Sequence, residues 1–244
     1  MIAVRTVSTA AFAALILSGA TPAFADGVGK FAEIAGTDVK RTAADGSVAK
    51  ARVGDEIALD DTITTGKGTR VKIQLNDESV IALDENSTLH IDEATFGEQT
   101  RFSATLSVGR FWSKVKKFVA GGDAKFEVKT DRAVAGVRGT VFRIDAVALA
   151  RSTRPKTTTV WVSEGKVAVD ATVKPSTAQS TCAPKKGQKG PRTQVPGPKE
   201  ISKDEWEKRF AELQQGMSVT VGEELWCVEP KPEPKDAFAK FVAQ

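Results

Sequence analysis

The stretch from Phe126 to Ile144 constrains the fold of this chain most strongly. Phe126 and Val128 alternate with charged residues, which is the pattern of a strand with one buried face. The apolar run breaks at Gly136 and resumes up to Phe142 and Ile144. The stretch therefore predicts two strands joined by a special connection.

Arg138, Gly139 and Thr140 lie in that connection. Gly139 is able to take a backbone angle that is closed to other residues, and Thr140 favours re-entry into a strand. Arg138 can reach carbonyl groups or a carboxylate. We interpret the connection as a structural corner with a paired arginine, in preference to a binding site.

Residues 27–171 repeat the pattern of short strands separated by Gly, Asp and Asn, which predicts an all-β domain. Val71, Ile73 and Leu75 alternate with polar residues, and a new strand follows each turn after roughly eight residues. This spacing suits a β-solenoid or a compact β-sandwich of many short strands. Periodicity alone leaves both arrangements open.

Four segments carry a resemblance to a known family. They are residues 64–71, 77–89, 126–142 and 160–169, with Ala-Val-Ala-Gly-Val-Arg-Gly-Thr-Val-Phe at the centre. Together they resemble the FecR-type periplasmic domain over roughly residues 27–171. That family is best known from transmembrane regulators that carry an iron-transport signal from an outer-membrane receptor to a sigma factor. The resemblance implies a FecR-like β domain whose activity is contact with another protein.

The resemblance also marks individual positions as structural and none as catalytic. These family-motif positions are Thr130, Gly136, Arg138, Gly139, Thr140, Phe142, Glu164 and Gly165.

Residues 1–25 have the pattern of an export signal. Arg5 precedes an apolar run, and Ala23-Phe24-Ala25 supplies the small residues that precede a cleavage site. We expect the mature chain to begin at Asp26 and to be periplasmic or secreted from a bacterium. The apolar run is too short for a membrane span, and no later stretch is longer. A membrane-crossing regulator of sigma factors is therefore not expected.

Charge gives little support for an anionic partner. The 35 Lys and Arg residues face 31 Asp and Glu residues, for a net charge of +4. The two signs are interspersed, and no basic stripe with interleaved aromatic residues is present, so we expect no nucleic-acid partner.

The composition changes after residue 171. Residues 172–200 are rich in Lys, Pro, Gly, Gln, Ser and Thr, which predicts a flexible linker. Residues 201–244 are expected to form a C-terminal appendage that docks on the β domain. Its first part has the pattern of a short amphipathic helix, with a capping box at Ser202 and an apolar face at Trp206, Phe210 and Leu213.

Gly216 marks the end of this predicted helix, and a returning strand is expected from Val219 to Val228. The tail that follows has an apolar face at Phe238 and Phe241, but it is too short to be helical alone.

The two cysteines, Cys182 and Cys227, predict one disulfide in an oxidising compartment. From position 182 to position 227 the bridge would close a loop of 45 residues. In the chain-entropy model this contributes about 4 kcal/mol. A free reactive thiol is the alternative, although neither cysteine has a neighbouring His or a Cys-x-x-Cys spacing.

The sequence contains few residues that could act in catalysis or bind a metal. His90 is the only histidine, which leaves no ordinary zinc site, and no Gly-x-Ser-x-Gly turn is present. The acidic turns at residues 77–78, 84–86 and 92–93 could stack into a calcium column, which we retain as a minority interpretation; otherwise no cofactor is expected. The same acids could form a glycosidase pair.

Trp112 and Trp161 are the aromatic side chains expected at a partner contact. The sequence as a whole predicts an exported, non-catalytic binding or scaffold module of the bacterial cell envelope, with an envelope protein as its partner. A periplasmic sensing module that works with a separate transmembrane regulator is one alternative. A carbohydrate-active hydrolase is the other, and nothing in the sequence specifically supports a carbohydrate or peptidoglycan ligand.

Overall fold

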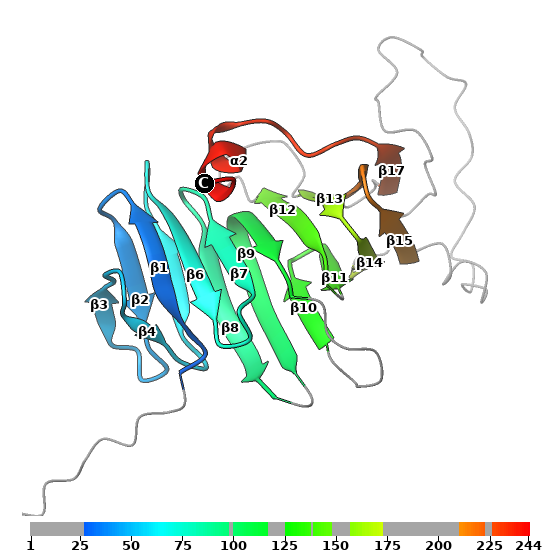
Figure 1. Cartoon of the computed structure of the whole chain (residues 1–244). Helices are drawn as coiled ribbons and strands as arrows, with labels where there is room; N and C mark the ends of the chain where they lie inside the picture. Colours follow the sequence, from blue (N-terminus) through cyan, green and yellow to red (C-terminus); the bar gives the residue numbers. More distant parts are fainter. Residues whose placement is uncertain are drawn as a thin grey trace, which may run out of the picture.

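A computed structural model describes residues 27–97, 100–116, 125–137, 139–147, 157–172, 210–222 and 226–244. These residues form seventeen strands and one short helix, which confirms the all-β prediction. The expected export signal, Arg138, Cys182 and the expected linker lie outside the described residues. In Figure 1 the strands follow one another along the molecule from blue to red, so neighbours in sequence are mostly neighbours in space.

The strands lie in two layers, which we call sheet A and sheet B. Sheet A runs, in order of pairing, through β4 (Glu56–Ile57), β1 (Gly29–Ala35), β6 (Arg70–Leu75), β7 (Val80–Leu83), the second half of β9 (Arg101–Lys114), β12 (Val141–Val147), β13 (Thr157–Glu164), β16 (Met217–Val221) and β17 (Trp226–Pro230).

Sheet B contains the remaining strands and the first half of β9. In order of pairing they are β3 (Val48–Lys50), β2 (Val39–Thr42), β5 (Thr62–Thr65), β8 (Thr88–Thr95), the first half of β9, β10 (Lys125–Lys129), β11 (Ala133–Val137), β14 (Lys166–Ala171) and β15 (Phe210–Gln214). The pairings described are antiparallel except the one between β9 and β10. Because a solenoid would stack its rungs in parallel, the arrangement is the sandwich of short strands.

Strand β9 joins the two layers because it changes sheets at Gly109. Its first half pairs with β8 and β10, and its second half pairs with β7 and β12. Gly109 has φ +104°, and a side chain there would meet Ser87 Oγ at 2.2 Å. The same Ser87 hydroxyl oxygen accepts a hydrogen bond from the Arg110 backbone N–H at 3.0 Å. Only glycine fits this bend.

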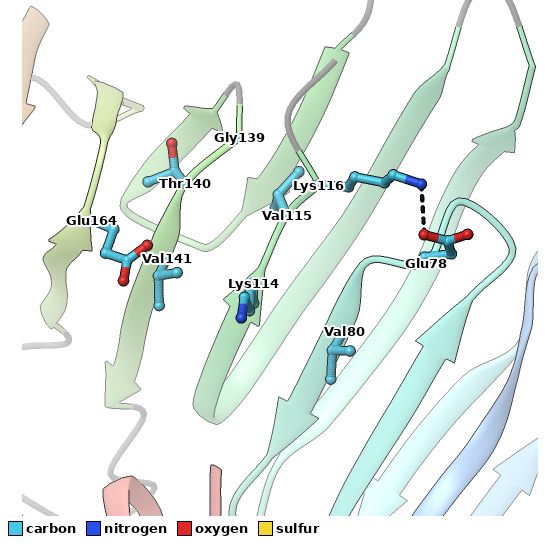
Figure 2. A pocket seen from close by; sticks show the side chains of 9 residues that line it. All are labelled: Glu78, Val80, Lys114, Val115, Lys116, Gly139, Thr140, Val141 and Glu164. Atoms are coloured by element: carbon cyan, nitrogen blue, oxygen red, sulfur yellow. Dashed lines mark hydrogen bonds and ion pairs between the residues drawn. The ribbon is translucent and has the colours of Figure 1, made fainter. Parts of the chain in front are cut away.

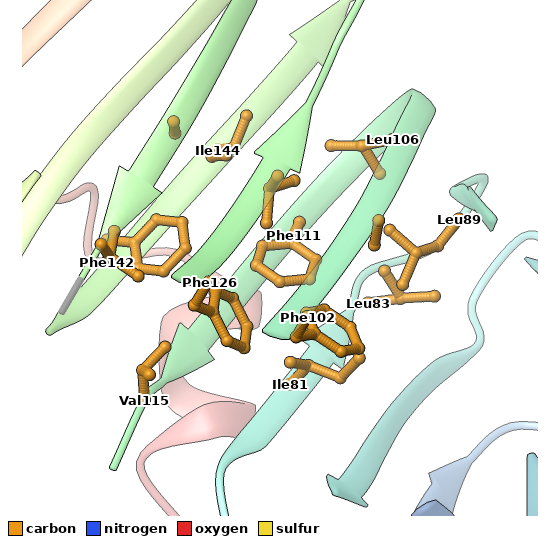
Figure 3. Packing of buried hydrophobic residues seen from close by; sticks show 14 of the residues in the cluster. Ile81, Leu83, Leu89, Phe102, Leu106, Phe111, Val115, Phe126, Phe142 and Ile144 are labelled. Carbon is orange, nitrogen blue, oxygen red and sulfur yellow. The ribbon is translucent and has the colours of Figure 1, made fainter. Parts of the chain in front are cut away.

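The core lies between the two layers, and four phenylalanines lie together in it: Phe102, Phe111, Phe126 and Phe142 (Figure 3). Phe102 and Phe126 of sheet B stack with ring centroids 4.6 Å apart. Phe126 meets Phe142 of sheet A edge-to-face at 6.3 Å, which ties one layer to the other. All three side chains are buried, and offset or edge-to-face pairs of this kind add stability beyond area burial.

The predicted helix between Ser202 and Gly216 is wrong over its second half. Residues 210–214 form strand β15, which pairs with β14 at the end of sheet B, and residues 201–209 lie outside the described part of the chain. Leu213 is fully buried in the core. The edge of β14 offers backbone hydrogen bonds that the helical pattern could not anticipate, and Gly216, with φ +79°, turns the chain from sheet B to sheet A.

The returning strand is found as expected, since β17 pairs with β16. Strands β15, β16 and β17 extend both sheets, so the described part of the predicted appendage shares the core of the sandwich. The short C-terminal helix lies later than expected, at α2 (Ala237–Val242). Asp236 caps it and Phe238 and Phe241 are buried beneath it, and these contacts make a helix of this length stable.

The connection between β11 and β12 requires a backbone conformation at Gly139 that other residues rarely adopt. Gly139 has φ +63°, so Gly139→Val should lower the free energy of unfolding by roughly 1 to 3 kcal/mol, measured by urea denaturation. Gly136→Val is the matched control, because Gly136 lies in β11 and a side chain there would meet only Ala168 O, at 4.0 Å. Equal effects of the two substitutions would contradict the interpretation of Gly139.

Candidate functional site

The outer face of sheet A carries a row of side chains that includes two tryptophans and two cations. Residues that lie directly opposite one another on six neighbouring strands make up this row, which we call the outer row. Its members are Lys72, Ala82, Trp112, Arg143, Trp161 and Ser218. The inward neighbours of these residues, such as Phe111, Phe142 and Val160, fill the core. Strand alternation therefore places the row on the side of sheet A that faces away from sheet B.

The C-terminal segment covers much of this row. After β17 the chain runs back across the molecule to α2, which lies near β7, β9 and β12 (Figure 1). Phe238 and Phe241 form a second, small hydrophobic cluster with Ala82, and Trp112 packs against it. The ammonium group of Lys72 lies 4.7 Å from the centre of the Phe241 ring, a cation–π contact. We call residues 231–244 the C-terminal strap.

Arg143 is the centre of the contact between the outer row and the strap. Its side chain is 1% exposed. The guanidinium donates to both carboxylate oxygens of Asp145, at 2.7 and 3.1 Å, and to Asp236 Oδ2 of the strap at 2.8 Å. Its carbon lies 5.5 Å from the ring centre of Trp161 and 5.4 Å from that of Phe238. One buried cation thus holds two aromatic rings and two carboxylates.

The strap supplies a second acid to the same site. Glu233 Oε1 lies 3.9 Å from Arg143 Nη1, and Glu233 Oε2 accepts a hydrogen bond from Ser163 Oγ at 2.6 Å. Asp236 has two roles, because its other oxygen accepts from the Ala239 backbone N–H at 2.9 Å and so caps α2.

Burial and charge shift the pKa values at this site in opposite directions. Burial raises the pKa of Asp145, although Arg143 opposes the shift. For Asp236, burial acts in the same direction but is outweighed by the hydrogen bonds from Arg143 and the Ala239 backbone, so its pKa is lowered. Burial would lower the pKa of Arg143, but hydrogen bonds to Asp145 and Asp236 raise it, and the guanidinium stays charged.

A line of alternating charges extends from Arg143 across sheet A. Arg110 lies 3.5 Å from Asp145 and donates to the buried Asp84 at 2.8 Å, which raises the pKa of Arg110. Asp84 also accepts from Arg70 Nε at 2.6 Å. Each buried carboxylate in this line therefore has a cationic partner, as burial of charge requires.

Beside the strap, the outer face is open and hollowed into a cavity of about 290 Å³ (Figure 2). Lys114 lies between Val80 and Val141 in register, and Val141 lies opposite Glu164. Further along the cavity, Lys116 and Glu78 form an exposed ion pair. The result is a mixed surface in which two valines flank Lys114 and further charges of both signs lie around them. Its lining residues are Glu78, Val80, Lys114, Val115, Lys116, Gly139, Thr140, Val141 and Glu164.

Several predicted motif residues meet at one wall of this cavity. Thr140 is buried, and its hydroxyl donates to Lys166 O at 2.9 Å, next to the Gly165 turn. Its carbonyl accepts from the Val115 backbone N–H at 3.0 Å. The Arg-Gly-Thr connection and the β13–β14 turn, distant in sequence, thus form one structural corner, whose Arg138 lies outside the described residues.

Other motif residues hold the sandwich together. The Thr130 hydroxyl lies 2.8 Å from that of Thr158, which links sheet B to sheet A, and Phe142 is in the aromatic core. Gly136 lies within β11. Cys227 is buried in β17, and its predicted bridge to Cys182 stays a prediction because Cys182 is not among the described residues.

Comparison with known proteins supports the resemblance in these residues. The model of the FecR protein family matches residues 61–168. The chain contains a FecR domain. The matched range begins just before β5 and ends in β14, so it includes the structural corner and most of the outer row. A comparison with curated proteins finds no match.

The chain is also similar to two crystal structures. Both are of a "putative anti-sigma factor" from Parabacteroides distasonis, at 1.65 and 2.50 Å resolution. Each is 14% identical with a TM-score of 0.46, and the match covers 74% of this chain. The matched part spans 64% and 63% of those two chains, and the likeness is too weak to transfer a function.

The two tryptophans predicted to contact a partner lie within the outer row of the FecR domain. Trp161 is 6% exposed and Trp112 is partly buried against the small cluster under the strap. Their role in partner contact stays a proposal, since this chain's own strap covers that surface. Sequence reasoning missed Arg143, Asp145 and Asp236. Arg143 between the apolar Phe142 and Ile144 was the available signal.

The remaining candidates of the sequence lie elsewhere. His90 is on β8 in sheet B, with Thr62 Oγ1 at 3.0 Å from its Nδ1. The acidic turns have protein partners: Asp77 accepts from Ser79, Asp84 from two arginines, and Asp92 from Thr105. In the part of the chain that the structure describes, no three His, Cys, Asp or Glu residues gather as metal ligands do.

The described residues include no helix with the length and apolar character that a bilayer crossing requires.

Asp236 gives a prediction for the pH dependence of stability. Its pKa is lowered in the folded chain, so its charge stabilises the fold above its unfolded pKa of about 3.9, and this stability is lost as the pH falls through the folded pKa. Asp236→Asn keeps an N-cap residue but removes the charge, and should cost about 1 kcal/mol near neutral pH.

Urea unfolding of both proteins at a series of pH values measures this difference. It should be constant from neutral pH down to about pH 5 and disappear as the pH falls through the lowered pKa of Asp236 in the folded chain. Asp145 shares the Arg143 guanidinium with Asp236, and the Asp236 charge is one cause of its raised pKa, so the difference between the two proteins reports on both acids. A difference that persists at acid pH would show that the Asp236 charge is not what docks the strap.

Proposed function

We propose that this FecR-domain chain is an exported, non-catalytic module that binds another protein of the bacterial cell envelope. The observation that carries the proposal is the open cavity on the outer face of sheet A, at the structural corner of the FecR domain. The family match supports a role related to signalling. Periplasmic location follows from the export pattern of residues 1–25 and is part of the proposal.

The chemistry of the cavity suits contact with a polypeptide. Val80 and Val141 are partly buried apolar residues, and the cation between them, Lys114, is exposed. Glu164 and the Glu78–Lys116 pair place charges at the rim. Apolar side chains beside solvated charges of both signs are a combination that protein interfaces use.

The same cavity is poorly suited to hydrolysis of a glycan. Two carboxylates line it, those of Glu78 and Glu164. A general acid in such an enzyme needs a raised pKa, whereas the hydrogen bond from Lys116 lowers the pKa of Glu78. Among the described residues that line it, none brings an aromatic ring on which a sugar could stack. We therefore favour binding over catalysis.

A sensing module that works with a separate transmembrane regulator is a second candidate. The match to the FecR protein family favours it, since that family resembles this chain at the corner beside the cavity. The two candidates use the same surface and differ in the partner that it contacts.

Site-specific photo-crosslinking in expressing cells tests the proposal. A crosslinking residue at Val141 should capture one defined envelope protein from the periplasmic fraction. The control position is Val48 on β3, which is 63% exposed and far from the cavity in the order of strands, and should capture none. Lys114→Glu in the same chain should abolish the Val141 crosslink while leaving the urea midpoint unchanged, because Lys114 is exposed.

The identity of the captured molecule separates the candidates. A protein with a membrane-spanning helix would favour the sensing module, and one without it would favour the scaffold. Capture of glycan fragments, or equal capture from Val48 and Val141, would contradict the proposed function.

A further inference from the structure

The C-terminal strap leaves polar groups of the outer row without hydrogen bonds. Within the described residues, Arg143 Nη1, Trp161 Nε1 and Ser218 Oγ have no hydrogen-bond partner, and neither does Glu233 Oε1. Arg143, Trp161 and Ser218 are each more than nine-tenths buried and lie side by side in register. Buried polar groups are rarely left in this state, so the outer row keeps unused hydrogen-bonding groups at Arg143, which the strap contacts, and at its neighbours in register.

The helix of the strap depends on its contacts with the sheet. It has six residues, which is too short to be stable without its contacts, and it buries two large side chains, Phe238 and Phe241. Residues 231–235, the part of the strap between β17 and α2, form no strand or helix and are largely exposed. The strap can therefore leave the outer row while β17 keeps its pairing with β16.

The outer row has the composition of a peptide-binding groove. Trp and Arg are the residues that most often dominate binding energy at interfaces, and here Trp112, Arg143 and Trp161 adjoin one another across three strands. The strap shows which chemistry fits them: carboxylates at Glu233 and Asp236 for the arginine, and aromatic rings at Phe238 and Phe241 for the apolar surface.

We propose that the outer row is a peptide-binding groove that the strap occupies in the free protein, and that an acidic and aromatic segment of a partner protein replaces the strap. The better occupant would supply oxygen acceptors to Trp161 Nε1 and Arg143 Nη1. This inference rests on the proposed function and adds to it the chemistry of the partner and a means of control. The outer row is then occupied either by the strap or by the partner segment, and these two states are in equilibrium.

Competition between the strap and a free copy of it tests the inference. The probe is a fluorescein-labelled peptide of residues 231–244, and the protein is the full chain. In the wild type the tethered strap is present at an effective concentration in the millimolar range and should largely exclude the peptide. Phe238→Ala in the chain weakens its own strap, so the intact peptide should bind at least about tenfold more tightly by fluorescence anisotropy.

Control variants of the strap, of the peptide and of Arg143 show whether the peptide binds at the outer row. Lys240→Ala in the same helix changes an exposed side chain and should leave peptide affinity at the wild-type value. A peptide with Asp236→Lys should not bind, and Arg143→Gln added to the Phe238→Ala chain should abolish binding of the intact peptide. If Phe238→Ala impairs folding, Asp236→Lys in the chain releases the strap by charge repulsion and should give the same gain.

Three outcomes would overturn the inference. Equal binding of the peptide to wild type and to both strap variants would show that the strap does not compete for this surface. No binding to any of them would make the strap a permanent part of the fold. A concentration-dependent wild-type dimer that the peptide dissociates would assign the groove to a second copy of this chain. In each case a specific crosslink at Val141 would leave the proposed function standing.

Discussion

The arrangement of the outer face depends on the burial of one cation, the Arg143 guanidinium. Removing such a charge from water costs several kcal/mol, and the cost is offset only where carboxylates and hydrogen bonds surround it. Asp145 supplies two hydrogen bonds from the same strand, and Asp236 supplies a third from the C-terminal strap. Because Asp145 is itself joined through Arg110 to Asp84, the position of the strap is set by a charge line anchored in β12, β9 and β6 and in the turn after β7.

The strands of the sandwich were predictable because their pattern is local. Val71, Ile73 and Leu75 alternate in sequence and are buried in the structure, and the Gly139 corner has the backbone angle that its motif suggests. The segment from Phe210 to Gln214 was not predictable in this way. Its spacing satisfies a helix as well as a strand, and the open edge of β14, more than forty positions earlier, decides between them.

The candidate site escaped sequence reasoning for a similar reason. Arg143 and Asp236 are 93 positions apart, and their pairing depends on the register of β12 and on the path of the strap. Trp112 and Trp161 were identified as contact residues from their type alone, and the register that places Arg143 between them was not visible. The aromatic residues of a β protein are identifiable from sequence, but the face on which they gather follows from how the strands pair.

Hydrogen exchange of the full chain with Arg143→Met tests most directly whether this buried cation docks the strap. The substitution keeps an apolar stem in the sheet and removes the charge. The account predicts that amides of α2 lose protection while those around Phe126, Phe142 and Val160 in the core keep it, with Lys114→Met on the same face changing neither. Loss of protection throughout the sandwich, or unchanged protection of α2, would contradict the account.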